Sequence, residues 1–558
     1  MRPEQLANSS GNHTRSRVTR VPDKLTGKGF HHVSLTRRQR WTLLATVSIG
    51  LLLITLDNSI LYTALPLLTE ELGATGSQTL WIINAYPVVI VGLLLGAGTL
   101  GDRIGHRRMF LIGLVIFGIA SAIAAFSPTA EWLIAARAVI AIGAAAMMPA
   151  TLALIRLSFD VERERNFAIA VWGTVSVVGS AIGPIVGGLL LEHFWWGSVF
   201  LIGIPFVVIA LIATVVVAPP NDPDPTKRWD AISSVQAMVG LVGAVFLIKE
   251  LANVPPNWMI IVAGALAAAL GLTSFVRRQR RLDDPLLDFA IFRNRAFSAG
   301  VLAAALSMFA VSGAQLVTTQ RFQLVEGFTP LQAGLLVTVV AIGSLPTSLL
   351  GGLYLDRVGL LPLIAGGLGV AAVGSVMMIF GIEDHLFWLM VAGLLISGVG
   401  LGSVMSVAST AIVGNVSARR AGMASSVEEV SYEFGSLIAV AILGSMLNFI
   451  YSATIKLPPG AESVARSSLP EAIGVAHGDQ AIINAANTAF DNGFLVTMIV
   501  LTVVLAVGAV VSARLLRNYG PGSRSQAYSN NDQEAWPCGP ASAMRFSKPR
   551  SGWWNAGE

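Results

Sequence analysis

Three glutamates lie within one apolar stretch near the end of the chain. Glu428, Glu429 and Glu433 fall between Gly422 and Tyr451, where most other residues are apolar or small. On a helix, Glu429 and Glu433 share one face because they are four residues apart. Three buried carboxylates cannot all be ionised cheaply, since burial and like charge both favour the neutral acid. We therefore expect at least one of them to bind and release a proton, whereas Glu428 alone could instead contact lipid headgroups.

Two residues of opposite charge lie in two other apolar stretches. Asp57 follows Trp41 by about 24 Å along a helix, at 1.5 Å per residue. Arg137 lies about 9 Å along the stretch that begins at Trp132, on the same rise. If these helices run in opposite directions, the two side chains could face each other at similar depth. Asp57 would then titrate or hold a cation in a central cavity, or it would be a structural partner for the arginine or for a backbone amide freed near Pro66.

The apolar stretches are long enough to cross a membrane as helices. Of the 558 residues, 54% are hydrophobic and 12% are charged, about half the charge of a soluble globular protein. A stretch of roughly 20 apolar residues spans the hydrocarbon core. The sequence therefore predicts an all-α polytopic membrane protein with fourteen transmembrane helices, at 41–68, 79–100, 109–126, 132–155, 166–191, 198–218, 231–251, 258–276, 296–319, 331–355, 363–380, 386–413, 422–451 and 493–516.

The basic residues predict the orientation of these helices. One set of alternate loops carries seventeen Lys and Arg residues, and the other carries only Lys249 and Arg321. Under the positive-inside rule, both termini are then cytoplasmic in a bacterial inner membrane. The net charge of +5 therefore indicates membrane topology and not nucleic-acid binding. We expect a basic cytoplasmic tail at 1–40, a loose extracytoplasmic loop at 452–492, and a disordered cytoplasmic tail at 518–558.

One loop pattern occurs twice. Gly98, Asp102, Arg103 and Gly105 recur with the same spacing 254 residues later, where the second copy contains Asp356 and Arg357 between Gly352 and Gly359. Duplicated halves are typical of secondary transporters, which rock around a site near the middle of the membrane. Turn glycines and arginines could recur once by chance, but two copies at equivalent positions favour a duplicated fold.

This repeated loop resembles a motif of the major facilitator superfamily. Three further segments, 56–66, 137–145 and 179–188, resemble its fourteen-helix drug:proton antiporter branch. The stretches 81–82, 192–196 and 427–432 are similar to pumps for quaternary ammonium compounds and methyl viologen. The resemblance implies a major facilitator fold of two six-helix bundles, at 41–219 and 294–517, with an inserted helix pair at 220–293. It also implies a membrane transporter and not an enzyme, which works as a monomer in lipid, is driven by a proton gradient and needs no cofactor or metal.

The resemblance also suggests roles for particular residues. It places the gating motifs at Gly98, Asp102, Arg103, Gly105, Arg107, Arg108, Asp356 and Arg357. Close helix packing, where the two halves are expected to meet, is assigned to Gly179, Gly183, Pro184, Gly187 and Gly188. The expected groups for protons and substrate cations are Asp57, Arg137, Glu428, Glu429 and Glu433.

Aromatic and polar residues are expected to complete a substrate pocket, because flat cations bind to the faces of aromatic rings. The candidates are Tyr62, Asn84, Tyr86, Trp172, Phe309 and Tyr432. Asn84 departs from the related pumps for divalent cations, which often have an acid there. The expected function is proton-coupled efflux of cationic lipophilic drugs, dyes and quaternary ammonium biocides. The alternative is export of an endogenous metabolite or lipid.

Overall fold

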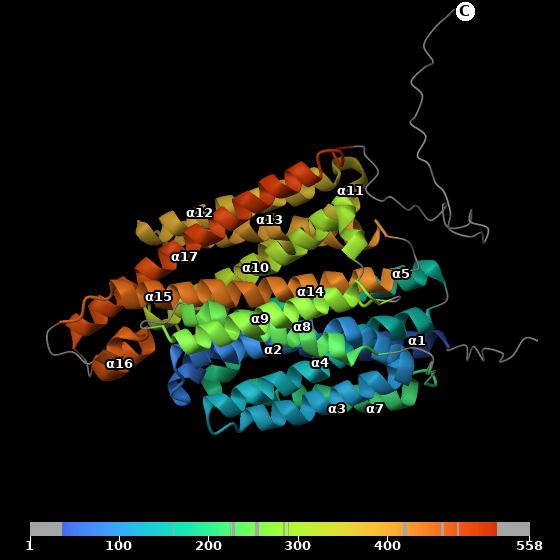
Figure 1. Cartoon of the computed structure of the whole chain (residues 1–558), viewed down its shortest axis with the longest axis horizontal. Helices are drawn as coiled ribbons and strands as arrows, with labels where there is room; N and C mark the ends of the chain where they lie inside the picture. Colours follow the sequence, from blue (N-terminus) through green and yellow to red (C-terminus); the bar gives the residue numbers. More distant parts are fainter. Residues whose placement is uncertain are drawn as a thin grey trace, which may run out of the picture.

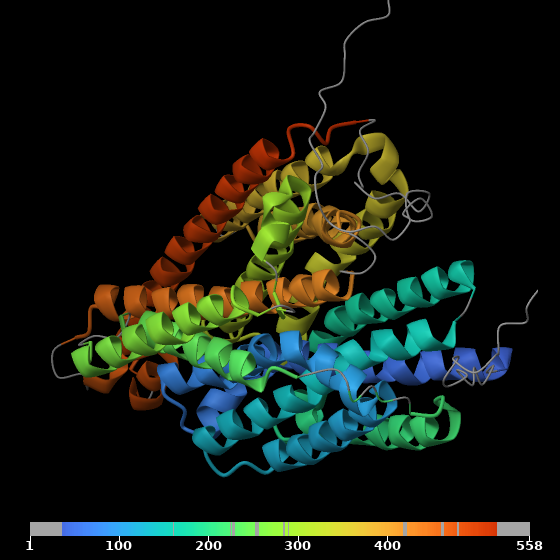
Figure 2. The same cartoon turned by 45° about the vertical axis from the view of Figure 1, so that its right-hand side comes forward.

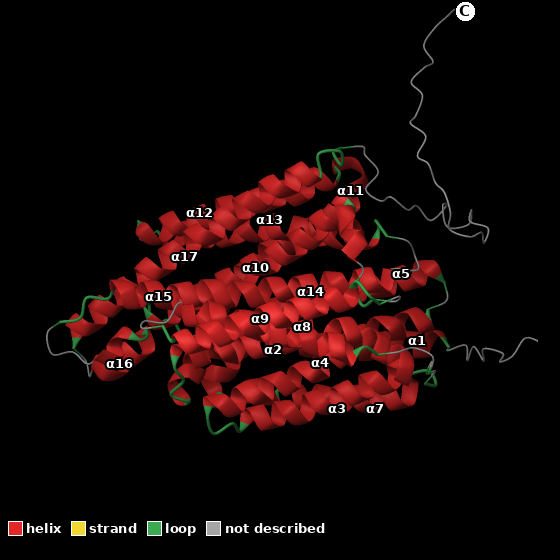
Figure 3. Cartoon of the chain, viewed as in Figure 1, coloured by secondary structure: helices red, strands yellow, loops and turns green. Residues whose placement is uncertain are grey.

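The computed structural model describes residues 36–521, except for 160, 222, 224, 226–228, 252–255, 283–284, 288, 385, 417–420, 459–462 and 477–478. Of the tails predicted at 1–40 and 518–558, residues 1–35 and 522–558 lie outside this part, and residues 37–40 already belong to the first helix. The described chain consists of helices joined by loops and turns, and it contains no strand in these ranges (Figure 3).

Fourteen of the helical segments in the described ranges are long and apolar enough to cross a membrane, by length and composition. The predicted number of spans and the all-α fold class are therefore confirmed. The helices are α1 (Arg37–Glu71), α2 (Gly76–Ile104), α3 (His106–Ala125), α4 (Ala130–Ser158), α5 (Glu162–His193), α6 (Ser198–Leu201), α7 (Gly203–Val217), α8 (Ala231–Leu251), α9 (Trp258–Gln279), η1 (Phe289–Arg293), α10 (Arg295–Leu324), α11 (Pro330–Val358), η2 (Pro362–Gly366), α12 (Gly367–Glu383), α13 (Phe387–Val413), α14 (Ala421–Ala439), η4 (Val440–Gly444), α15 (Ser445–Thr454), η5 (Ser463–Arg466), α16 (Leu469–Ala476) and α17 (Gln480–Leu515).

The helices form two groups that lie side by side (Figures 1 and 2). A large apolar cluster fills the group of α1–α7, and a second cluster fills the group of α10–α17. We call these groups the first and second bundle. Helices α1, α5, α10 and α11 pack across the interface between them.

The two ends of the molecule differ in character. At one end, α1 begins at Arg37, the turn after α2 follows Arg103, and α17 finishes one residue after Arg514. We call this the basic end. The opposite end carries α16 and the segment 455–479, and we call it the loop end. The second bundle fans away from the first towards the basic end, whereas the two bundles converge at the loop end (Figures 1 and 2).

The internal repeat extends over a whole helix and its turn. Helices α2 and α11 both begin with a capping box, in which Thr75 or Thr329 exchanges hydrogen bonds with the glutamine three residues later. Both end at a glycine with positive φ, Gly105 at 91° and Gly359 at 84°, a conformation that disfavours residues with a Cβ. These start and end points recur at the same 254-residue offset, so the duplication governs the local fold as well as the charges.

The inserted pair α8–α9 packs against the side of this assembly. Leu241 and Val245 of α8 form an apolar cluster with Val88 and Val91 of α2 and with Leu437 of α14. Helix α8 therefore covers the line along which α2 of the first bundle meets α14 of the second. Helix α9 packs mainly on α8, and most of its surface faces outwards.

Two charged residues counted with the loops lie in helices. Arg321, beyond the predicted span 296–319, lies in the last turn of α10, and Lys249, inside the predicted span 231–251, lies in the last turn of α8; both are buried. The ammonium group of Lys249 donates a hydrogen bond to the carbonyl of Ser77 at 2.8 Å and lies over the ring of Trp81. Arg321 forms ion pairs with Glu326 and Asp491 at 2.9 and 2.8 Å. Both cations thus stabilise contacts between helices at the loop end.

The segment predicted as a loose loop at 452–492 is largely folded. Helix α17 already begins at Gln480, and η5 and α16 occupy part of the connection. Leu469, Ala472 and Ala476 of α16 are buried. Their spacing of three and four residues places them on one face of the short helix. The segment therefore packs against the protein through this apolar face, whereas a loop surrounded by solvent was expected.

Candidate substrate and proton site

An ion pair joins α1 to α4 inside the first bundle. A guanidinium nitrogen of Arg137 donates to a carboxylate oxygen of Asp57, and Arg137 has no solvent-exposed surface. The Nε of Arg137 also donates to the carbonyl of Ile82 at 3.4 Å, and its guanidinium carbon lies 4.7 Å from the centre of the Tyr86 ring. The similar depth predicted for Asp57 and Arg137 is confirmed by this contact.

Two polar groups at this pair have no partner among the described residues, namely Nη2 of Arg137 and the hydroxyl of Tyr86. Both amide atoms of Asn84, elsewhere on α2, also have no partner in the described part of the chain. Asn84 and Tyr86 are fully buried in α2. Buried polar atoms are normally hydrogen-bonded, to the protein or to ordered water. Unpaired polar atoms grouped around a buried charge mark a place where water, a proton or a polar substrate can be bound.

The second bundle brings a carboxylate to this group. Glu433 of α14 lies within electrostatic range of Arg137 and of Glu429 on its own helix. Its Oε2 is buried and has no hydrogen-bond partner in the described part of the chain. Glu428 faces α13 instead, where the hydroxyl of Ser409 donates to it at 3.1 Å. The three glutamates therefore separate into one that belongs to the α13 contact and two that belong to the interior between the bundles.

A layer of neutral polar groups links the bundles on the loop-end side. The hydroxyl of Tyr62 lies 3.3 Å from that of Ser436, which accepts a hydrogen bond from Ser312 at 2.8 Å. Gln315 and Gln323 of α10 donate to main-chain carbonyls of α1 at 3.4 and 3.0 Å. The sequence analysis singled out Tyr62 but missed these serines and glutamines. The two glutamines could have been found from the sequence, because an unpaired amide within an apolar membrane helix is costly and indicates a hydrogen-bond partner.

The other predicted pocket residues lie in different surroundings. Trp172 is buried in the apolar core of the first bundle, where its indole N–H has no partner among the described residues. Phe309 belongs to the core of the second bundle. Tyr432 packs against a separate apolar cluster that contains Phe297 and Ile412. Any contact between these three side chains and a substrate stays a prediction.

The repeated loop motif makes its contacts within the first bundle. Asp102 pairs with His106 at 2.9 Å, one turn further along the chain. Arg107 donates to the carbonyl of Val215 at 2.7 Å. Asn221, which follows α7, donates to the carbonyl of Ile104 at 2.7 Å and accepts from a main-chain N–H at 3.1 Å. The side chain of Asp356, in the second copy, lies outside the described residues.

The glycines of α5 serve two different contacts. A Cβ at Gly179, Gly183 or Gly187 would meet α1 of the same bundle. A Cβ at Gly188 would lie 2.3 Å from the Cα of Leu331 on α11, in the second bundle. Of the five residues predicted to pack where the halves meet, Gly188 contacts α11 and the carbonyl of Pro184 lies against Gly334 of α11. Gly179, Gly183 and Gly187 lie against α1 instead.

We expect Gly188→Ala to reduce transport about tenfold, because overpacking a tight contact costs roughly 1–3 kcal/mol and here opposes closure of the loop end. The added methyl group would meet the backbone of α11, which cannot move aside as a side chain can. Substrate efflux at matched expression measures the effect. Gly173→Ala on the same helix is the control, since a Cβ there meets nothing within 4 Å. Full-rate efflux by Gly188→Ala would contradict the role of this contact.

No cluster of three or more His, Cys, Asp or Glu that could hold a metal ion occurs in the part of the chain that the structure describes. The groups described at the site above are carboxylates, one guanidinium, phenols and amides. Such groups can bind a cation and exchange it for a proton.

The sequence and fold of this chain are similar to those of known transporters. Residues 47–323 and 296–455 match the family described as the Major Facilitator Superfamily. The methyl viologen resistance protein SmvA of Salmonella typhimurium is 35% identical over 464 residues, which cover 81% of this chain and 93% of that protein. The multidrug efflux pump LfrA of Mycolicibacterium smegmatis is 35% identical over 504 residues, 88% of this chain and 99% of that one.

A solved structure of similar fold is that of a bacterial homologue of the human lysosomal transporter Spinster, in an inward-facing and unoccupied conformation. It has a TM-score of 0.62 and 16% identity, and the match covers 87% of this chain and 99% of that one. With two duplicated bundles, fourteen helices in the described ranges that are long and apolar enough to span a membrane, and these matches, the chain belongs to the major facilitator superfamily, a family of membrane transporters and not of enzymes.

Proposed function

We propose that this protein exports cationic lipophilic drugs, dyes and quaternary ammonium compounds in exchange for protons. The observation that carries the proposal is that Glu433 of the second bundle lies within electrostatic range of Arg137, which is paired with Asp57 in the first. A carboxylate with a free oxygen, placed where the two bundles meet, can bind either a proton or a cation. The names of SmvA and LfrA, for methyl viologen resistance and multidrug efflux, support this substrate class.

The exchange follows from competition for the same carboxylates. The basic end faces the cytoplasm in a bacterial inner membrane. A cation enters between the bundles from that side and binds at Glu429 and Glu433. The bundles then rock, and the site faces the other side. Protons there neutralise the carboxylates and release the cation, and the neutral carrier returns. Each proton that moves down a membrane potential of 100 mV supplies roughly 2.3 kcal/mol for this exchange. Because one chain contains both bundles, a monomer suffices.

The test is efflux of ethidium or methyl viologen from a pump-deleted bacterial host that expresses the chain. We expect efflux that stops when a protonophore is added. In liposomes, purified protein should transport the same cations with a pH gradient and without ATP. Transport that needs ATP and ignores the pH gradient would refute the mechanism. Inserted protein without efflux of any cation would favour the alternative, export of an endogenous metabolite or lipid.

Asn84 offers a test of substrate charge. Its amide is fully buried in α2, two residues from Tyr86, and has no partner among the described residues. Because a second carboxylate attracts a second positive charge, we expect Asn84→Asp to raise resistance to dications such as chlorhexidine roughly fourfold. Resistance to the monocation ethidium should change less. Asn84→Leu is the control of similar size without charge. Equal dication susceptibility in Asn84→Asp and the unmodified chain would contradict this role.

A further inference from the structure

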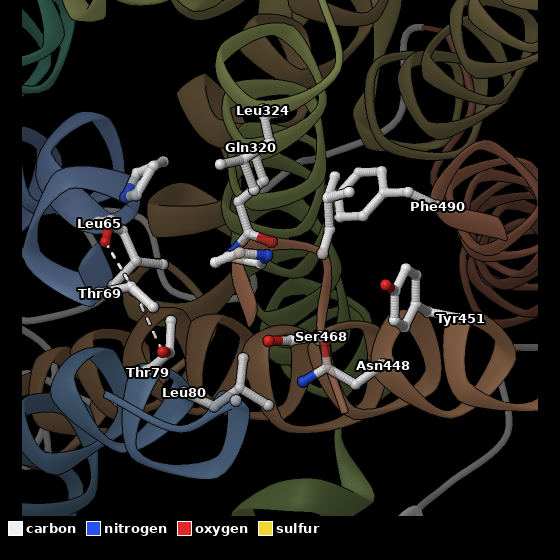
Figure 4. Close-up of a pocket in the computed structure, with 15 residues that line it drawn as sticks. Leu65, Thr69, Thr79, Leu80, Gln320, Leu324, Asn448, Tyr451, Ser468 and Phe490 are labelled. Carbon is white, nitrogen blue, oxygen red and sulfur yellow. Dashed lines mark hydrogen bonds between the residues drawn. The ribbon is translucent and has the colours of Figure 1, made fainter. Parts of the chain in front are cut away.

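A cavity lies on the seam between the two bundles at the loop end. In this conformation its enclosed space is about 30 Å³, room for two or three water molecules. It is lined by residues of α1, α2, α10, α15, α16 and α17. Thr69 and Thr79 of the first bundle are hydrogen-bonded to each other on one side, at 3.1 Å. Gln320 and Asn448 of the second bundle face them across the space (Figure 4). The cavity is thus built from both halves of the transporter.

This cavity is separate from the central carboxylates. Leu65, Pro66 and Thr69, which line it, follow Tyr62 on α1 by three to seven residues. At 1.5 Å per residue the cavity lies about 5–10 Å further towards the loop end. The polar layer of Tyr62, Ser436 and Ser312 closes the space between the two sites. A substrate released from the carboxylates towards the loop end would reach this cavity next.

The segment 463–476 forms a roof over the cavity, and Ser468, Leu469 and Pro470 line it from that side. The roof is held on α15 by two hydrogen bonds to its main chain. The hydroxyl of Tyr451 donates to the carbonyl of Ala465 at 2.9 Å, and that of Ser452 donates to Arg466 at 2.8 Å. Helix α16 also contacts α17 and α1, so the roof touches both bundles.

The roof carries one carboxylate beside the cavity, Glu471, and one exposed cation further along it, Arg466. Glu471 directly follows the lining residue Pro470, and its Oε2 is buried without a hydrogen-bond partner among the described residues. It lies within electrostatic range of Tyr451, which also lines the cavity. Burial raises the pKa of Glu471 above its ordinary value, although a hydrogen bond from Ser467 opposes this. No Lys or Arg is among the residues that line the cavity.

We propose that this cavity widens into a second cation site as the bundles begin to separate at this end, and that an exported organic cation pauses there beneath the roof before it is released. The hydroxyl and amide groups and the rings of Tyr451 and Phe490 that line it suit a flat, lipophilic, positively charged ligand, and the carboxylate of Glu471 lies next to the lining residue Pro470. The roof must leave α1 when the bundles separate at this end, which opens the cavity to the outside. The inference rests on the proposed function and adds an exit site to it.

Protection of a single cysteine tests the proposal. In a Cys538→Ser chain, Ser468→Cys places one thiol in the cavity with little change in size. Intact spheroplasts are treated with a membrane-impermeant maleimide and with increasing methyl viologen, which does not cross lipid. We expect slow labelling that methyl viologen suppresses, whereas uncharged 4,4′-bipyridine should give no protection. Absence of labelling, or equal protection by bipyridine, would overturn the proposal.

A charge substitution then isolates the role of the roof. Glu471→Gln should raise the concentration of methyl viologen needed for half-protection about tenfold, and Glu471→Asp should restore most of the affinity. Glu383→Gln is the matched control, because Glu383 is an exposed glutamate at the loop end of α12. Unchanged protection in Glu471→Gln would reject this carboxylate as a ligand.

Efflux driven by a pH gradient, measured on the same Ser468→Cys chain, separates the two proposals. Efflux without protection by methyl viologen overturns the exit site and leaves the proposed function standing. Protection without efflux of any cation supports the cavity as a cation site and counts against proton-coupled export.

Discussion

Replacing Arg137 with leucine is expected to abolish drug efflux and to destabilise the chain by about 3–5 kcal/mol, the usual cost of removing one partner of a buried ion pair. The carboxylate of Asp57 would stay buried without its counter-charge. Asp57→Asn should destabilise less, because the guanidinium of Arg137 keeps the carbonyl of Ile82 and the ring of Tyr86. Thermal unfolding of the purified protein in detergent, together with ethidium efflux from cells, measures both effects.

The double variant decides what the pair is for. Asp57→Asn with Arg137→Leu removes both charges, so its stability should lie well above that of Arg137→Leu alone. The coupling energy of the pair is the stability change of the double variant minus those of the two single variants. If the pair serves in proton or cation exchange, the stabilised double variant still transports nothing. Efflux that returns together with stability would show that Asp57 is only a structural partner for Arg137.

The meeting of Asp57 and Arg137 could be predicted because it depends on few quantities. The direction of each helix follows from the count of spans, and the depth of each residue follows from the helical rise. The ion pair confirms that estimate. The separation of Glu428 from Glu433 was partly accessible in the same way, since helical spacing predicts which residues share a face. The hydrogen bond from Ser409 to Glu428 was not, because it depends on how α13 packs beside α14.

The loop end could not be predicted from local pattern. Hydropathy predicts where a span lies but not which group a cation in its last turn contacts, so Lys249 and Arg321 were both counted among the loop charges. Their burial depends on Ser77 and Trp81 for one, and on Asp491 for the other. Helix α16 has only eight residues, and its apolar face gains stability only from the helices that it covers.

The positions of the contacts suggest how the two bundles are coupled. Hydrogen bonds between α1 and α10 and the close approach of α5 to α11 lie in the middle or the loop-end half of these helices. Opening at the loop end must break them, and it must also part Glu433 from Arg137. A ligand that neutralises Glu433 weakens that attraction. We propose that this electrostatic attraction between the bundles links proton binding to the conformational change.

Glu433→Gln is therefore expected to uncouple transport from the proton gradient. The glutamine keeps the size of the side chain and its polarity but cannot exchange a proton. In liposomes, efflux driven by a pH gradient should fall to the rate of vesicles without protein, while exchange of labelled for unlabelled ethidium at equal pH continues. Addition of drug to the purified protein in weak buffer should no longer release protons. The two measurements together distinguish loss of proton coupling from loss of drug binding.

Glu428 and Glu429 provide the matched comparison on the same helix. Because Glu428 is bound by Ser409 and faces α13, Glu428→Gln should keep most of the gradient-driven efflux. Glu429 lies within electrostatic range of both other glutamates, so Glu429→Gln should give an intermediate rate with fewer protons released per drug bound. If Glu428→Gln lost proton release and Glu433→Gln kept it, the proton would be carried at the α13 contact. The electrostatic link between Glu433 and Arg137 would then have no part in coupling, because the group that titrates would lie on another face of α14.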